Sequence, residues 1–191
     1  MTVPTAYLAP VSWYRAVLCE PCEVEVWESF PKQTLRNRCR IAGPNGVQTL
    51  TVPVQKCERK QYTRDVKIAW QTDWRHRHRQ ALQSAYRSTP YFDYYADFFQ
   101  PVYEQRFTFL TDLNEALHDV VMRLLTAGSE VHPAPLSKTK EWQATDCDKA
   151  FTGAGTQPYY QRFADRQGFQ ENLSIADLLF NTGPEALLYL L

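Results

Sequence analysis

The first third of the chain has the two-residue alternation of β-strands. From Glu23 to Glu28, acidic residues alternate with Val and Trp, which is the period of a half-buried strand. Pro44-Asn45-Gly46 predicts a hairpin turn, because Asn-Gly tolerates the positive φ that such turns need. We predict a helix over Val11–Leu18 and strands over Thr5–Ala9, Glu23–Glu28, Leu35–Ala42 and Val47–Val54. The last three strands follow one another along the chain and are predicted to pair antiparallel.

Beyond Ile68 the apolar spacing changes to the three and four residues of helices. One face of the first helix carries Trp74, His78, Ala81, Leu82 and Ala85. Pro90 is predicted to begin a second helix. Pro101 should kink or restart that helix, because proline lacks an N–H and clashes with the preceding turn. Thr111 is predicted to cap a third.

The closing segment predicts two short helices joined by a tight loop. Ser174 has the position of an N-cap whose hydroxyl accepts from the Asp177 backbone N–H. Asn181-Thr182-Gly183 should end this helix and Pro184 should begin the next, as glycine and proline commonly do.

Together these elements predict one α/β domain, of the α+β kind, over residues 1–191. An antiparallel or mixed sheet from the N-terminal third would be covered by helices of the middle and C-terminal segments. Periodicity is lost over residues 128–157, which predicts a long loop, either functional or mobile.

Charge and composition exclude several classes of protein. The 21 basic and 21 acidic residues balance, so the chain lacks the basic excess of nucleic-acid-binding proteins. The N-terminus lacks the pattern of a signal peptide, and no apolar run approaches the roughly 18 residues that cross a bilayer. We therefore expect a cytoplasmic protein with no nucleic-acid partner and no membrane insertion. The sequence gives no prediction of whether the protein is a monomer or an oligomer.

Basic residues form the sharpest chemical feature of the first half. Lys32 is followed by Arg36, Arg38 and Arg40, and alternate residues of a strand share one face. Guanidinium groups match carboxylate and phosphate oxygens, so the array predicts a site for an anionic small molecule, such as a nucleotide-linked sugar. The alternative is a solvated strand face that pairs with Glu23, Glu25 and Glu28.

Other candidate groups are less distinctive. His78 lies on the apolar face of its predicted helix, where a buried imidazole is either a general acid or base or a structural group. Cys19-Glu-Pro-Cys22 has the spacing of a redox pair, but it follows a helix end rather than opening a helix, so we predict unliganded thiols and no metal site. Signatures of P-loop, G-x-S-x-G and H-E-x-x-H enzymes are absent, and no cofactor is indicated.

The chain resembles the WbqC-like protein family in its compact form. The likeness is carried by KQTLRNRCRI, GVQTLTVPV, Trp74-x-x-x-His78, STPYFDYYADFFQPVYEQRFTFLTDLN and the closing LSIADLLFNTGP. The first predicted strand departs from the pattern: it reads TAYLAPVSWY where longer members have a His-Gln-Pro-like run. The resemblance implies a cytoplasmic role in bacterial cell-surface polysaccharide, O-antigen or lipopolysaccharide, biosynthesis.

The resemblance also favours a functional rather than a packing role for part of the closing segment. Tyr159, Tyr160 and Gln161, with Asn181, are the residue types of a pocket that stacks on a ring and hydrogen-bonds its edge. A group transfer on an anionic sugar precursor would use Arg36 and Arg38 as clamps, with His78 or Asp177 as acid or base. The rival is a non-catalytic protein of the same pathway that uses this pocket, or the aromatic surface around Tyr91–Phe99, to hold a ligand or partner.

A cytoplasmic location predicts that the five cysteines are free thiols, since an odd number spread unevenly does not form a disulfide framework. Alkylation of freshly isolated protein followed by mass spectrometry should label Cys19, Cys22, Cys39, Cys57 and Cys147. Recovery of two intact intramolecular disulfides would contradict the cytoplasmic assignment.

Overall fold

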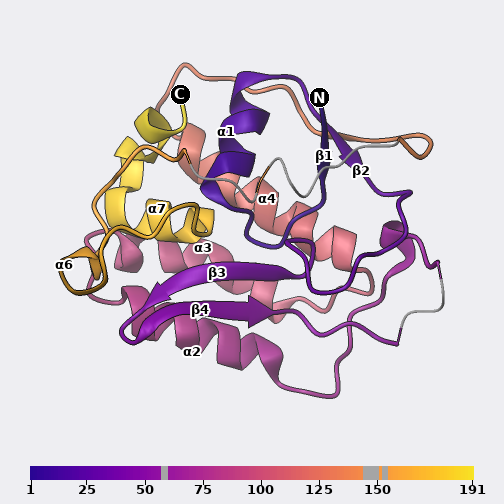
Figure 1. Cartoon of the computed structure of the whole chain (residues 1–191), viewed down its shortest axis with the longest axis horizontal. Coiled ribbons are helices and arrows are strands. Elements are labelled where there is room, and N and C mark those ends of the chain that lie inside the picture. The colour runs from indigo at the N-terminus through magenta and orange to yellow at the C-terminus, as the bar shows by residue number, and fades with distance from the viewer. Residues whose placement is uncertain (57–59, 144–150, 152–154) are drawn as a thin grey trace.

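The computed structural model describes residues 1–56, 60–143, 151 and 155–191 (Figure 1). Cys57 and Cys147, and part of the predicted 128–157 loop, lie outside the described residues. The strands are β1 (Thr2–Pro4), β2 (Glu23–Glu25), β3 (Arg38–Gly43), β4 (Gly46–Thr51) and β5 (Ser137–Lys138). The α-helices are α1 (Val11–Cys19), α2 (Trp74–Tyr86), α3 (Phe92–Glu104), α4 (Leu110–Thr126), α6 (Ala164–Gln167) and α7 (Ile175–Thr182). Two 3₁₀ helices are η1 (Thr63–Asp65) and η2 (Gly183–Tyr189).

The predicted α/β class is confirmed, with strands mostly in the N-terminal part and helices after them. The strand pairing, however, differs from the antiparallel arrangement predicted for three successive strands. β2 pairs in parallel with β1 and β5, whereas only β3 and β4 form the antiparallel hairpin around Gly43 and Gly46. β2 ends at Glu25 because the buried carboxylate of that residue accepts a hydrogen bond from the Trp27 backbone N–H, 2.6 Å away, and so turns the chain.

The predicted strand over Thr5–Ala9 is replaced by an irregular segment after β1, and Leu8 in it has a φ of 41°. Hydrogen bonds from both sides hold this segment. The Tyr7 N–H donates to the Leu35 carbonyl (2.9 Å), and the Ala9 carbonyl accepts from the Ile175 N–H (2.8 Å). The segment therefore connects the start of α7 with the chain that leads into β3.

The helices of the middle segment form largely where the apolar spacing predicts them. α2 begins at Trp74 after Asp73, whose side chain caps it. α3 neither restarts nor ends at Pro101; the helix continues to Glu104, since a single proline removes only one N–H from the helical ladder. α4 begins at Leu110, one residue before the predicted cap Thr111, because a bridge between Lys67 and Phe109 holds the preceding backbone extended.

Every residue of α7 is buried, and this helix contacts α1, α2, α3, β3 and η2. Ser174 is the N-cap as predicted, but its hydroxyl accepts from the Ala176 N–H (3.3 Å) rather than from that of Asp177. Gly183, with a φ of 58°, ends the helix, and Pro184 follows in η2. The two closing helices and their tight loop are thus confirmed.

Replacing Gly183 with alanine should lower the free energy of unfolding by about 2 kcal/mol or more. Its positive φ disfavours any L side chain, and a Cβ at this position would overlap the ring of Tyr91. Chemical denaturation measures the loss. Gly128→Ala is the matched control, because Gly128 has a φ of 73° but nothing lies within 4 Å of the added carbon. An equal loss in both variants would show that Tyr91 adds no constraint.

Candidate functional site

A cleft of about 380 Å³ lies between the segment before α1, the outer face of the β3–β4 hairpin and the approach to α7. Its walls come from parts of the chain that are far apart in sequence. The lining residues are Leu8, Pro10, Gln33, Thr34, Leu35, Arg38, Cys39, Arg40, Thr49, Phe151, Asn172 and Ser174. The cleft therefore joins the predicted arginine strand to the C-terminal segment.

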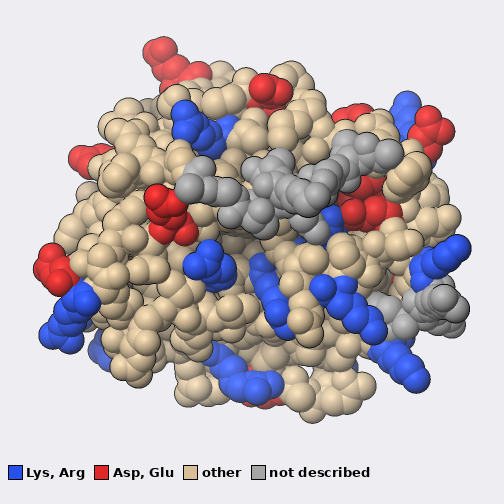
Figure 2. Space-filling model, viewed as in Figure 1, with Lys and Arg blue, Asp and Glu red and all other residues tan. Residues whose placement is uncertain are grey.

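Two of the predicted arginines line this cleft. Arg38 and Arg40 are alternate residues of β3, and Arg38 is half-buried whereas Arg40 is exposed. Within the described part of the chain neither guanidinium has an ion pair or a hydrogen bond, and the buried Nε of Arg38 has no partner. Figure 2 shows Lys and Arg side chains spread over the face that carries β3 and β4 in Figure 1. The cleft therefore has a local positive charge although the whole chain is neutral.

Strained backbone borders the same cleft. Four described residues other than glycine have a positive φ, and three of them line it: Leu8 (41°), Gln33 (66°) and Asn172 (52°). Asparagine tolerates this conformation, but for leucine it is rare and costs free energy. Such conformations persist only where the surrounding structure enforces them, and they gather at functional sites.

Hydrogen bonds hold the walls in place. The Ser174 N–H donates to the Arg40 carbonyl (2.8 Å), and the Ser174 hydroxyl donates to the Leu8 carbonyl (2.8 Å). The Asn172 amide accepts from the Ser12 N–H (3.0 Å) and donates to the Phe151 carbonyl (2.7 Å). These bonds occupy Asn172 and hold the walls in place around the two arginines, whose guanidinium groups stay without a partner among the described residues.

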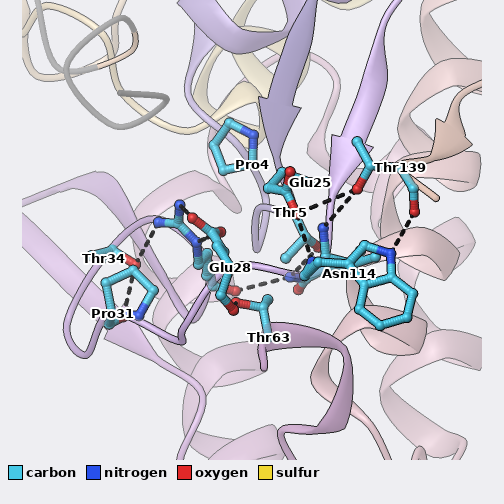
Figure 3. Close-up of polar contacts among 12 residues, drawn as sticks. Pro4, Thr5, Glu25, Glu28, Pro31, Thr34, Thr63, Asn114 and Thr139 are labelled. Carbon is cyan, nitrogen blue, oxygen red and sulfur yellow. Dashed lines mark hydrogen bonds and ion pairs between the residues drawn. The ribbon is translucent and has the colours of Figure 1, made fainter. Parts of the chain in front are cut away.

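Arg36, predicted to share a strand face with Arg38, lies before β3 and points into the protein instead. Its guanidinium forms a buried ion pair with Glu28 and donates to the Thr34 hydroxyl (3.1 Å), as Figure 3 shows beside the labelled Glu28 and Thr34. The Arg36 carbonyl accepts from the Asn114 amide (2.9 Å). The alternative to an anion site is pairing of the basic residues with glutamates. Arg36 forms such a pair with Glu28. Lys32 is exposed and does not line the cleft.

The predicted pocket around Tyr159 and Gln161 is filled by a buried carboxylate. Asp177 is fully buried and accepts from the hydroxyls of Tyr86 and Tyr159 (2.8 Å each) and from the Gln161 amide (3.1 Å). Burial raises the pKa of Asp177 to about 6, and the three donors oppose that shift. The arrangement ties α2 and the segment before α6 to α7. Asp177 lines none of the cavities described here, so the geometry gives it a structural role.

The remaining predicted residues of the closing segment lie outside the cleft as well. The Asn181 amide donates to the Asp177 carbonyl (2.7 Å) and accepts from the Arg162 N–H (3.2 Å), so both of its polar atoms stabilise the end of α7. Tyr160 is exposed and is directed to solvent rather than into a pocket.

His78 lies in a buried aromatic cluster under the hairpin. Its Nδ1 is 2.8 Å from the Tyr7 hydroxyl, which is 2.6 Å from that of Tyr103, and the ring packs edge-on against Trp74. Burial lowers the pKa of His78 to about 4, so the imidazole is neutral at pH 7. His78 does not line the arginine cleft.

Sequence reasoning missed Leu8, Gln33, Phe151 and Asn172. Only Asn172 carried a local signal, because Asn favours positive φ and stands two residues before a capping serine. Leu8 and Phe151 become neighbours of the arginines through tertiary contacts, whereas Gln33 lies in the same run of sequence but gave no local sign of its positive φ.

Comparison with known sequences agrees with the resemblance carried by the motifs. A sequence model of the WbqC-like protein family matches residues 27–136 and 130–189. The chain belongs to the WbqC-like protein family. It is also similar to the uncharacterized protein Rv1507c of Mycobacterium tuberculosis, with 32% identity over 194 residues that cover 84% of this chain and 83% of the relative. No solved structure matches this chain. In the described part of this family member, no helix has both the length and the apolar character of a membrane span.

Buried histidines predict acid sensitivity. The pKa of His78 is about 4 in the folded protein and about 6.5 when exposed, so the folded state binds fewer protons and its stability falls as the pH drops from about 6.5 to 4. The loss for one such group is on the order of 3 kcal/mol. His118, whose pKa burial also lowers to about 4, adds a loss of the same sign. Asp177 acts in the opposite sense, since a raised carboxyl pKa favours the folded state as the pH falls through about 6.

Urea denaturation at several pH values checks this prediction. His78→Asn keeps an acceptor near Tyr7 and cannot take up a proton, so it should reduce the pH dependence between 6.5 and 4. The same change at exposed His76 on α2 is the control and should leave the dependence as in the wild type. An unchanged slope in His78→Asn would mean that the imidazole is not held neutral.

Proposed function

We propose that this protein binds an anionic sugar precursor, phosphorylated or nucleotide-linked, in the arginine cleft. We further propose that it does so in a cytoplasmic step of bacterial cell-surface polysaccharide or O-antigen biosynthesis. The observation that carries the proposal is that Arg38 and Arg40, which have no partner among the described residues, line a cleft bordered by backbone with positive φ. Family membership supports the biological setting.

The arginines favour an anion because a free guanidinium gains most from a charged acceptor. Phosphate and carboxylate oxygens fit its fork of donors, and the resulting charge-assisted hydrogen bonds are about twice as strong as neutral ones. Arg38 is half-buried, so a bound anion there would be less screened by water than on an open surface. Two guanidinium groups on one strand face suit a phosphate or diphosphate.

Other lining groups suit the rest of such a ligand. The side chains of Gln33 and Thr49 have no hydrogen-bond partner among the described residues, so an amide and a hydroxyl are free for sugar hydroxyls. Pro10, Leu35 and Phe151 add apolar surface. A volume of about 380 Å³ is in the range of small-molecule sites.

Binding is the step that these contacts support most directly. Cys39 also lines the cleft, but burial raises the pKa of its thiol well above the ordinary value, so it remains protonated rather than a thiolate nucleophile. The proposed role therefore rests on ligand recognition. Once a ligand has been found, a separate assay for conversion of the sugar tests group transfer.

Arg38→Ala and Arg40→Ala should each weaken binding of a nucleotide-linked or 1-phosphorylated sugar by about 1.5 to 3 kcal/mol, the usual worth of a hydrogen bond to a charged group. Calorimetric titration with a panel of such sugars measures the affinity. Raising the salt concentration should weaken wild-type binding, because exposed charges are screened. Neither variant should lower the melting temperature, since neither guanidinium pairs with any residue that the structure describes.

Arg87→Ala is the matched control, since Arg87 is an exposed arginine at the end of α2, away from the cleft residues. It should bind as the wild type does. Arg36→Ala serves as a contrast: it should unfold at lower temperature, because Glu28 would lose its buried partner. Unchanged affinity in both cleft variants would overturn the anion-binding proposal.

A further inference from the structure

A second cavity, of about 250 Å³, lies between α1, β2, α4 and residues 133–138. It shares no lining residue with the arginine cleft. Since one water molecule takes up about 30 Å³ of liquid, the cavity has room for a small organic molecule. Neither the family assignment nor the function proposed above uses it.

One face of α4 supplies the polar side of this cavity. Thr111, Asn114, Glu115, His118 and Asp119 line it from successive turns, and their spacing of three to four residues places them on one helix face. Apolar residues line the rest: Met122 from the same helix, and Trp13, Val26 and Leu136 from other parts of the chain. The cavity thus combines an acidic rim with a hydrocarbon wall.

Two buried atoms of the polar side lack a hydrogen-bond partner within the described part of the chain: Asn114 Oδ1, which can only accept, and His118 Nδ1, which donates or accepts according to its tautomer. Asn114 is 2% exposed and donates its amide hydrogens to the Thr5 hydroxyl (3.0 Å) and the Arg36 carbonyl (2.9 Å), as Figure 3 shows beside the labelled Asn114 and Thr5. A carbonyl can only accept, so the bond to Arg36 fixes the amide nitrogen on that side and leaves Oδ1 without a donor. A ligand that donates a hydrogen bond would therefore satisfy this buried acceptor.

The carboxylates at the rim are not equivalent. Glu115 is paired with Lys138, its carboxylate 2.7 Å from the ammonium nitrogen. Asp119 has no ion pair or hydrogen bond within the described part of the chain. Asp119 lies at the exposed rim, where some loss of solvation and the neighbouring Glu115 charge raise the pKa of its carboxyl, and a cation placed beside it would oppose that shift.

We propose that this cavity binds a small organic molecule that carries a protonated primary amine. The ammonium group lies beside Asp119 and supplies hydrogen-bond donors to the polar side, where the buried Oδ1 of Asn114 lacks one among the described residues. The hydrocarbon part of the ligand packs on Trp13, Met122 and Leu136, where apolar surface leaves water. This inference is independent of the anion-binding function, because the two cavities have different walls.

Cyclohexylamine is a suitable probe, with cyclohexanol as its neutral counterpart. In nitrogen–proton NMR spectra, the amine should shift the indole signal of Trp13 with a saturable dependence on concentration. Cyclohexanol and cyclohexanecarboxylate should bind at least fivefold more weakly. Asp119→Asn should weaken amine binding at least fivefold and should leave cyclohexanol binding unchanged, a readout that a merely misfolded variant would not give.

Two controls separate this proposal from other effects. Asp112→Asn makes the same change on α4 at a residue outside the cavity lining, and Arg38→Ala alters only the anion cleft; both should bind the amine as the wild type does. Equal affinity for amine and alcohol, no saturation, or an unchanged affinity in Asp119→Asn would overturn the proposal. A loss in Asp112→Asn equal to that in Asp119→Asn would also overturn it, because the effect would then reflect general surface charge.

Discussion

The structure depends on the complete burial of α7, a helix of eight residues in which no position faces solvent. Its polar groups must therefore find partners inside the protein, because an unpaired buried polar group costs about 1 to 3 kcal/mol. Ser174 meets this requirement at the first turn by bonding to Arg40 and Leu8. Asp177 meets it farther along through Tyr86, Tyr159 and Gln161. The same bonds that satisfy the helix also join β3, α2 and the N-terminal segment around it.

This requirement explains why the arginine cleft exists where it does. The start of α7 is hydrogen-bonded to the carbonyls of Leu8 and Arg40, so it ties together two walls of the cleft. Enforced φ values at Leu8, Gln33 and Asn172 are the cost of that arrangement. Residues such as Asp177, Gln161 and Asn181 therefore support the cleft indirectly, by holding the helix that holds its wall.

Two cavities of contrasting chemistry lie along the N-terminal segment of this neutral chain. Leu8 and Pro10 line the arginine cleft, and Thr5 and Ala6 line the second cavity beside α4. Asn114 links the two regions, because it lines the second cavity and donates to the carbonyl of Arg36, next to cleft residue Leu35. An even overall balance of charge thus conceals a local arginine pair at one cavity and a pair of rim carboxylates at the other.

Local patterns in the sequence determined much of the fold. Apolar spacing predicted α1 and α2, Asn-Gly predicted the hairpin, and Ser174 with Gly183 predicted both ends of α7, because each of these signals acts within a few residues. The alternation of Arg38 and Arg40 likewise placed both on one strand face. Family membership was also readable from the motifs of the chain.

Only the tertiary structure decided which of the candidate residues meet. Arg36 lies in the same run of sequence as Arg38, yet its side chain is buried in an ion pair with Glu28. A buried charge is stable only when an opposite charge lies close to it. Tyr159 and Gln161 carry the residue types of a pocket, yet a buried carboxylate occupies their donors. Strand pairing and the positive φ of Leu8 depend on contacts between distant segments, which no local pattern encodes. Short-range signals specify helices and turns, whereas a site is assembled by the long-range satisfaction of buried polar groups.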